Sequence, residues 1–158
     1  MGSGLIVAGT GHRPEDAEDE AAVRIKSRVK LEYAKKPIDT FITGMAAGFD
    51  LWAADEAIKL GLDITAAVPW RGHKPRKADE ELYAHILASA KSVVYVVDQD
   101  NYPGGWVYQK RNEWMVDHAD LIMAYWNPNK PFGGTYNCYQ YAKDQDKPIA
   151  NIWYDPPF

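Results

Sequence analysis

Arg111 and the paired glycines Gly133 and Gly134 are the residues whose types and spacing point most directly to chemistry. A glycine pair that opens a helix lets backbone N–H groups approach a phosphate, because no Cβ atom stands in the way. Arg111 belongs to a predicted helix that precedes this loop, so its guanidinium could complete an anion site. A plainer interpretation stays open, in which the glycines make a tight turn and Arg111 pairs with a surface carboxylate.

Three glycine-bearing loops each follow a predicted strand, at residues 9–14, 44–48 and 128–135. In an open α/β sheet the carboxyl ends of the strands lie along one edge, and ligands bind there. We therefore expect these loops to converge in space, with the irregular segment 70–77 near the same site. The loop 44–48 is similar to a phosphate-facing turn, but it has neither the Walker sequence nor the glycine spacing of the dinucleotide fingerprint.

The polar side chains of the first two loops each have two interpretations. Arg13 could grip a phosphate, and His12 could hydrogen-bond a base or a ribose. Alternatively, His12 caps backbone groups and Arg13 makes a surface ion pair. Asp50 is either the cap of the helix that follows or an acceptor for a ligand hydroxyl.

Apolar runs and helical spacings predict the elements that must position these residues. The expected strands cover residues 5–8, 40–43, 63–68, 92–97, 121–125 and 148–152, and the expected helices lie near 22–33, 50–60, 82–90, 107–118 and 136–143. Strands that alternate with helices imply βαβ units, and nearly continuous apolar strands indicate burial on both faces. We expect one α/β domain over residues 1–158, with a mainly parallel sheet flanked by helices.

The composition limits the classes of protein that this chain can represent. Its 158 residues carry 18 Lys and Arg against 22 Asp and Glu, a formal net charge of −4. This balance argues against a protein bound along the DNA backbone. No apolar run approaches a membrane span and no secretion signal is apparent, so we expect a cytoplasmic protein. Residues 1–4 could be a remnant of cloning.

Other side chains give little support for metal, cofactor or thiol chemistry. The four histidines, at positions 12, 73, 85 and 118, lack paired ligand spacing, so we expect no metal site and no cofactor. Cys138, the single cysteine, lies inside a predicted helix without an obvious base, and it suits a reducing compartment.

The aromatic content is high, with six Trp and ten Tyr. Because aromatic side chains are favoured at interfaces, we expect a homo-oligomer, and specifically a dimer. Some of these side chains could instead stack on a base, although core or interface roles are more common. The candidates for stacking are Trp70, Tyr102, Trp106, Trp114 and Trp126.

Four segments together resemble the YpsA-like branch of the SLOG superfamily. They are Thr-Gly-His-Arg-Pro at 10–14, Thr-Gly-Met-Ala-Ala-Gly-Phe-Asp at 43–50, Gln-Lys-Arg-Asn-Glu-Trp-Met at 109–115 and Gly-Gly-Thr at 133–135. The resemblance extends over nearly the whole chain. It implies a Rossmann-like fold, an origin in bacteria or their phages, frequent dimerisation, and an association with nucleotides or nucleotide-derived ligands.

Two related families define the functional alternatives. DprA-type DNA-processing proteins, which bind single-stranded DNA, carry a similar glycine turn and an Arg-Asn pair that match residues 44–50 and Arg111-Asn112. Lonely-guy phosphoribohydrolases carry a helix Arg, matched by Arg111, and a glycine loop followed by a catalytic Glu. Asn137 stands at that Glu position, and an amide cannot act as a general base, although it can hydrogen-bond a ribose.

These observations lead to three hypotheses and one set of candidate residues. The favoured hypothesis is binding, as sensing or sequestration, of a nucleotide or nucleotide-derived small molecule, without nucleic acid or membrane partners. A nucleotide N-glycosidic hydrolase, with Arg111 and Glu113 or Asp50 as catalytic candidates, is the first alternative, and a DprA-like single-stranded DNA binder is the second. The candidate ligand-binding residues are Gly9, Gly11, His12, Arg13, Gly44, Met45, Gly48, Asp50, Arg111, Asn112, Gly133, Gly134, Thr135 and Asn137.

Overall fold

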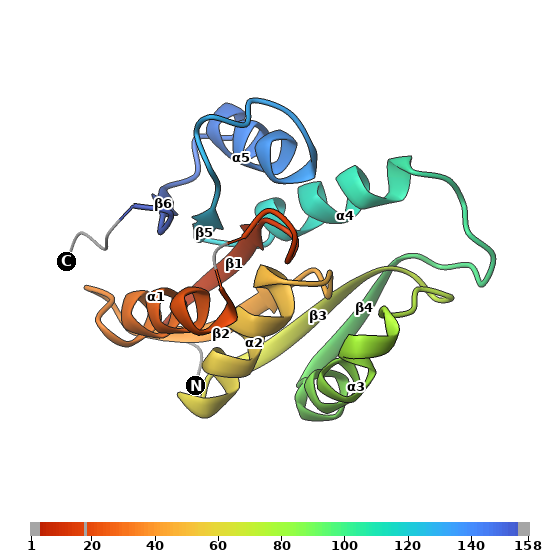
Figure 1. Cartoon of the computed structure of the whole chain (residues 1–158), viewed down its shortest axis with the longest axis horizontal. Helices are drawn as coiled ribbons and strands as arrows, with labels where there is room; N and C mark the ends of the chain where they lie inside the picture. Colours follow the sequence, from red (N-terminus) through yellow and green to blue (C-terminus); the bar gives the residue numbers. More distant parts are fainter. Residues whose placement is uncertain (1–3, 18, 155–158) are drawn as a thin grey trace.

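The computed structural model describes residues 4–17 and 19–154, which form a six-stranded sheet flanked by helices (Figure 1). The strands are β1 (Leu5–Gly11), β2 (Ile38–Thr43), β3 (Asp63–Trp70), β4 (Ser92–Val97), β5 (Leu121–Tyr125) and β6 (Ile149–Asn151). The helices are α1 (Glu20–Glu32), α2 (Phe49–Lys59), α3 (Glu80–Ser89), α4 (Trp106–Asp117) and α5 (Gly134–Asp144), with a short 3-10 helix η1 (Lys77–Asp79). Residues 1–3 of the segment that could be a cloning remnant lie outside the described residues.

The sheet has the order β4-β3-β2-β1-β5-β6, and every neighbouring pair is parallel. The chain moves outward from β1 to β4 and then crosses back to place β5 on the other side of β1 (Figure 1). Such a reversal opens a crevice beyond the ends of the two central strands, because their connections run to opposite faces of the sheet. The predicted α/β domain with a mainly parallel sheet flanked by helices is confirmed.

The sheet is buried on both faces, because successive side chains of a strand point in opposite directions. Val7 and Phe41 pack in the layer that contains α1, α2 and α3. Their neighbours Ala8 and Ile42 pack in the layer that contains α4 and α5. This two-sided core explains the nearly continuous apolar strands of the sequence, and it leaves the loops as the place for polar side chains.

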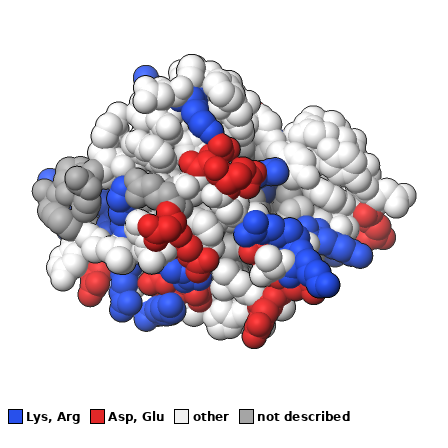
Figure 2. All heavy atoms as spheres, viewed as in Figure 1, with Lys and Arg blue, Asp and Glu red and all other residues white. Residues whose placement is uncertain are grey.

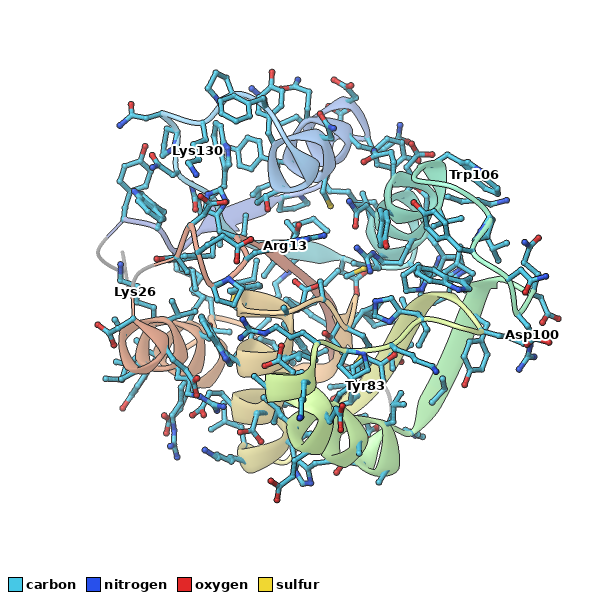
Figure 3. All side chains as sticks on the ribbon, turned by 45° about the vertical axis from the view of Figure 1, so that its right-hand side comes forward. Arg13, Lys26, Tyr83, Asp100, Trp106 and Lys130 are labelled. Carbon is cyan, nitrogen blue, oxygen red and sulfur yellow. The ribbon has the colours of Figure 1, made fainter. Side chains whose placement is uncertain are left out.

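The surface is mixed in charge and carries several exposed aromatic side chains. On the face shown in Figure 2, basic and acidic side chains are interspersed. Tyr102 and Trp106, which precede or begin α4, are 58% and 54% exposed. Figure 3 shows Trp106 and Asp100 toward the periphery, whereas Arg13 lies near the middle of the view. No helix within the described ranges is long and apolar enough to cross a membrane.

Candidate ligand-binding site

A cavity of about 830 Å³ opens at the carboxyl edge of the sheet. The loops after β1, β2, β3 and β5 line it together with the first half of α4, so the three glycine loops converge here. Arg111 shares this cavity with the Gly133 loop. The residues singled out from the sequence that line it are Gly9, Gly11, His12, Arg13, Met45, Asp50, Arg111, Asn112, Gly133, Gly134 and Thr135.

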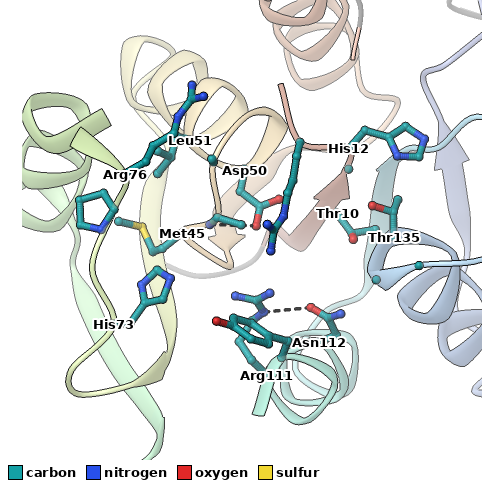
Figure 4. Close-up of a pocket in the computed structure, with 18 of the residues that line it drawn as sticks. Thr10, His12, Met45, Asp50, Leu51, His73, Arg76, Arg111, Asn112 and Thr135 are labelled. Carbon is teal, nitrogen blue, oxygen red and sulfur yellow. Dashed lines mark hydrogen bonds between the residues drawn. The ribbon is translucent and has the colours of Figure 1, made fainter. Parts of the chain in front are cut away.

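Arg111 is a buried cation in the wall of this cavity, with 6% of its surface exposed (Figure 4). Its Nε donates to Asn112 Oδ1 at 2.9 Å, and its Nη1 donates to the backbone oxygen of Gly44. Among the described residues, no carboxylate oxygen lies within 4.0 Å of the guanidinium, and Nη2 has no acceptor. The interpretation of Arg111 as half of a surface ion pair is therefore wrong.

The third nitrogen of this guanidinium faces the cavity. The only fully buried side-chain nitrogen or oxygen without a partner in the described part of the chain is Ser27 Oγ. Nη2 of Arg111, which has no partner either, must therefore be accessible. Burial lowers the pKa of Arg111, and the nearby Asp50 opposes that shift. The cavity thus contains a desolvated cation with one donor nitrogen unused by the protein.

The glycines of the second loop serve the packing of the protein itself. A Cβ atom at Gly44 would lie 2.9 Å from Cζ of Arg111, so this glycine makes room for the guanidinium. Gly48 has a φ of 87°, and a Cβ atom there would lie 2.8 Å from the backbone oxygen of His12. Neither glycine lines the cavity. At both positions neighbouring protein atoms already fill the space that a side chain would take, so the structure does not place these two predicted ligand residues in the cavity wall.

The glycines of the first loop line the cavity but also have a packing role. A Cβ atom at Gly9 would lie 2.5 Å from the ring of Phe41, and one at Gly11 would lie 2.4 Å from the ring of Phe49. These distances are far below ordinary contact. The rings of Phe41 in β2 and Phe49 in α2 can therefore pack against β1 only because Gly9 and Gly11 have no side chains.

Asp50 presents a buried carboxyl group to the cavity, with 7% of its surface exposed (Figure 4). Its Oδ2 accepts a hydrogen bond from the Ala46 N–H at 3.3 Å, whereas Oδ1 has no donor among the described residues. Burial raises the pKa of Asp50 to about 6, against the opposing effect of Arg111. The N-cap of α2 is Gly48, so the capping interpretation of Asp50 is wrong.

The N-terminus of α5 is open toward the cavity. Its N-cap is Gly133, with a φ of 94° and no side-chain capping bond. The Asn137 N–H donates to the Gly133 oxygen at 2.9 Å, which leaves the N–H groups of Gly134 and Thr135 without an acceptor in the described chain. A Cβ atom at either glycine would meet nothing within 4 Å. Free N–H groups at the positive end of a helix favour an anion.

His12 and Arg13 take different roles. His12 Nε2 accepts the Asn127 N–H at 2.7 Å, and the ring packs edge-on against Tyr125 and Trp153 at centroid distances of 6.1 and 5.8 Å. The backbone-capping interpretation of His12 is the one observed, and burial lowers its pKa. The Arg13 side chain is exposed and forms no ion pair with a described residue.

Glu113 and Asn137 lie outside the cavity. The carboxylate of Glu113 accepts a hydrogen bond from Gln109 Nε2 at 3.3 Å. Residues two apart on a helix face different directions, so Glu113 does not share the cavity-facing side of Arg111. Asn137 is exposed on α5. The structure therefore does not bring Asn137 or Glu113 together with the candidate residues that line the cavity, and a ligand contact of Asn137 stays a prediction.

Several cavity residues were not singled out from the sequence. They are His73, Lys74, Arg76, Tyr108 and Lys130. Three of them belong to the segment after β3, and the convergence of strand ends was the signal that could have found them. Trp70 lies edge-on to His73 and Tyr108, at centroid distances of 5.2 and 5.9 Å. Burial lowers the pKa of His73 to about 4, so the ring is neutral at pH 7. Of the aromatic candidates for base stacking, Trp70 alone lines the cavity.

The side chains in and near the cavity do not offer a thiol nucleophile or a metal site. Burial raises the pKa of Cys138 to about 11, so its thiol stays protonated near neutral pH and is a poor nucleophile. Within residues 4–17 and 19–154, no group of three or more His, Cys, Asp and Glu could hold a metal ion.

Residues 10–155 match the YpsA family, described as the YspA SLOG family, and the chain belongs to that family. It is also similar to the uncharacterised SPbeta prophage-derived protein YoqJ of Bacillus subtilis. The two are 34% identical over 119 residues, which cover 65% of this chain and 68% of YoqJ. The family membership indicated by the four sequence segments is confirmed.

Among solved structures, the chain resembles DNA processing protein A (DprA) of Streptococcus pneumoniae, with a TM-score of 0.71 and 18% identity over 92% of this chain and 49% of that one. It also resembles DprA of Helicobacter pylori, whose single-stranded DNA binding mode is known, with a TM-score of 0.69 and 16% identity over 92% and 63%. The chain thus spans less than two thirds of either protein. At these identities the likeness shows the Rossmann-like fold alone.

Proposed function

We propose that this protein binds a phosphorylated nucleoside-type small molecule in the cavity and holds it without rapid turnover. The observation that carries this proposal is the buried guanidinium of Arg111, whose Nη2 faces the cavity without a protein acceptor. A buried cation without a paired carboxylate is costly, and a bound phosphate would supply the missing partner.

The surroundings of Arg111 suggest how such a ligand lies. Phosphate oxygens would accept hydrogen bonds from Nη2 of Arg111 and from the free N–H groups at the start of α5. Arg13 would contact the phosphate from the exposed side of the cavity. The unpartnered oxygen of Asp50 would accept a sugar hydroxyl. The ring of Trp70, against which His73 and Tyr108 pack edge-on, would offer an apolar surface to the base. Sensing and sequestration both follow from binding of this kind.

The experiment is calorimetry with adenosine monophosphate and with inorganic phosphate. Loss of a charged phosphate contact costs on the order of 1.5–3 kcal/mol, so Arg111→Ala should weaken binding roughly ten- to a hundredfold and leave folding largely intact. Arg28→Ala is the matched control, because Arg28 contacts Glu56 at 3.8 Å outside the cavity. Unchanged affinity in Arg111→Ala would remove the binding role.

A nucleotide N-glycosidase is the second candidate, and the position of Asp50 favours it. Asp50 is a buried carboxyl group in the cavity with a pKa raised to about 6, as acid–base catalysis near neutral pH requires. Release of free base from a nucleoside monophosphate at about one per second or faster would establish this reading. Asp50→Asn should then abolish release, while Glu113→Gln should retain it.

A DprA-like single-stranded DNA binder is the third candidate, favoured by the likeness in fold to a protein with that activity. Fluorescence anisotropy with a labelled oligonucleotide would test it. Phosphate contacts make such binding strongly salt-dependent, so affinity should fall steeply as salt rises. The net charge of −4 favours the small-molecule reading.

We also propose that the protein is a cytoplasmic homodimer. Tyr102 and Trp106 are exposed aromatic side chains, a residue type favoured at subunit interfaces, and Val93 is an exposed apolar side chain on the edge strand β4. Light scattering should give twice the mass of one chain, and a monomer at high concentration would contradict the dimer. Cell fractionation would test the location.

A further inference from the structure

The cavity has two aromatic ends rather than one. Its volume of about 830 Å³ lies toward the upper end of the range for small-molecule sites, roughly 300–1,000 Å³. In Figure 4, Arg111 lies between His73 on one side and Thr135 on the other. The buried cation is therefore central, and the cavity extends from it in two directions.

The first end is a cluster of aromatic side chains around Trp70. Trp70 is held edge-on by His73 and Tyr108, and His73 Nδ1 shares a hydrogen bond with the hydroxyl of Tyr83 at 2.9 Å. Lys74 lines the cavity on the same segment. A flat ring beside a cation suits a nucleobase followed by a phosphate.

The second end carries an aromatic side chain that the protein leaves exposed. Phe132 lines the cavity, is 68% exposed, and makes no ring contact with another described residue. It directly precedes Gly133 and the open N-terminus of α5. Lys130, which is paired with Asp16, lines the same end. Like the first end, the second end therefore places an aromatic ring beside a cation. It also offers the free N–H groups at the start of α5.

We propose that the ligand of this site is a dinucleotide, in which two nucleosides are joined through phosphate. This inference rests on the proposed nucleotide-binding function and specifies its ligand. The linking phosphate lies at Arg111 and the start of α5, one base lies against Trp70, and the other stacks on Phe132. Both pyrophosphate and phosphodiester linkages satisfy this chemistry.

The test compares four probes by calorimetry on the full chain: adenosine monophosphate, pyrophosphate-linked diadenosine, phosphodiester-linked diadenosine and a single-stranded oligoadenylate. One of the two dinucleotides should bind at least about tenfold more tightly than the monophosphate, because stacking of a second base adds affinity. Comparison of the two identifies the linkage. Phe132→Ala should remove this advantage and leave monophosphate affinity unchanged, while Tyr154→Ala, at an exposed aromatic residue outside the cavity, should change neither.

Each other outcome overturns the dinucleotide proposal. If the monophosphate binds and neither dinucleotide binds more tightly, the inference fails while the proposed function stands. If Phe132→Ala weakens both classes equally, the two-ended arrangement is wrong. If affinity keeps rising with oligonucleotide length, the ligand is a polymer. If no probe binds, both the inference and the proposed function fail.

Discussion

Two glycine turns at the same edge of the sheet look alike in sequence and differ in physical role. In the turn at residues 44–48, neighbouring protein atoms lie 2.8 to 2.9 Å from the positions that Cβ atoms would occupy at Gly44 and Gly48. The Phe49 N–H, at the start of the helix, already donates to His12. In the turn at Gly133 and Gly134, nothing lies within 4 Å of those positions, and the first N–H groups of α5 have no acceptor in the described chain.

A glycine-rich strand–helix turn is therefore not by itself a ligand site. Gly44 and Gly48 are required by what already packs on them, including the guanidinium of Arg111. The Gly133 turn is unoccupied by protein and exposes donors at the positive end of a helix. The turn at residues 44–48 positions the guanidinium of Arg111, whereas the turn at Gly133 and Gly134 leaves space for a ligand.

The largest expected effect is a loss of stability on substitution in the turn at residues 44–48, where protein atoms fill the space beside the glycines. Gly48→Ala introduces a Cβ atom at a backbone conformation with φ 87° and ψ −129°, where it would meet the backbone of His12. Backbone strain and overpacking together should cost about 4 kcal/mol, which lowers the melting temperature by roughly 10 °C. Thermal unfolding measures this loss. A variant as stable as the original would show that this turn is not tightly packed.

The second expected effect is a pH dependence that arises from Asp50, the second residue of α2, which follows the turn at residues 44–48. Because burial raises its pKa from 3.8 to about 6, folding favours the protonated carboxyl group, and this contribution to stability is lost as the pH rises from about 4 to about 6. Asp50→Asn has no such loss. Its stability relative to the original should therefore rise by up to about 3 kcal/mol between pH 4 and pH 7. Melting curves across that range would show it, and a difference that is constant with pH would contradict the burial argument.

The smallest expected effect is on ligand affinity, at the turn formed by Gly133 and Gly134. It distinguishes a loss of binding from a loss of stability. Gly134→Ala adds a Cβ atom that meets no protein atom, at the first residue of α5. Stability should be unchanged or rise by about 0.5 kcal/mol, because alanine is the better helix former. Adenosine monophosphate should bind about fivefold more weakly, a change of about 1 kcal/mol, because the methyl group occupies ligand space. Gly105→Ala, at the start of α4 and outside the cavity, is the matched control and should leave affinity unchanged.

Much of the fold was predictable from the sequence because its signals are local. Apolar strand runs and helical spacing identified all six strands and all five main helices of the described chain. Alternation of strands and helices then implied the parallel sheet. The exact helix starts were less predictable. Asp50 has the residue type of a cap, but the close contact of Gly48 with His12 fixes the helix start two residues earlier.

The site was predictable in outline and not in detail. The rule that strand ends share one edge brought the correct loops together, but it cannot tell a glycine that packs from one that faces a cavity. His12 illustrates the limit, since its ring is committed to the Asn127 N–H, a contact 115 residues away in sequence. Asn137 matches a position in a motif, but it is exposed on α5 and does not line the cavity, which a motif position cannot reveal.

The most direct test of the account is a titration of the ¹⁵N-labelled protein with inorganic phosphate, followed by the backbone amide signals of the two glycine turns. We expect the amide signals of Gly134 and Thr135 to shift in a saturable way, with much smaller changes at Gly44 and Gly48. The same titration of Arg111→Ala should leave the Gly134 and Thr135 signals nearly unmoved. Saturable shifts confined to residues 44–48, or identical shifts in the original protein and in Arg111→Ala, would contradict the claim that Arg111 and the open turn form one anion site.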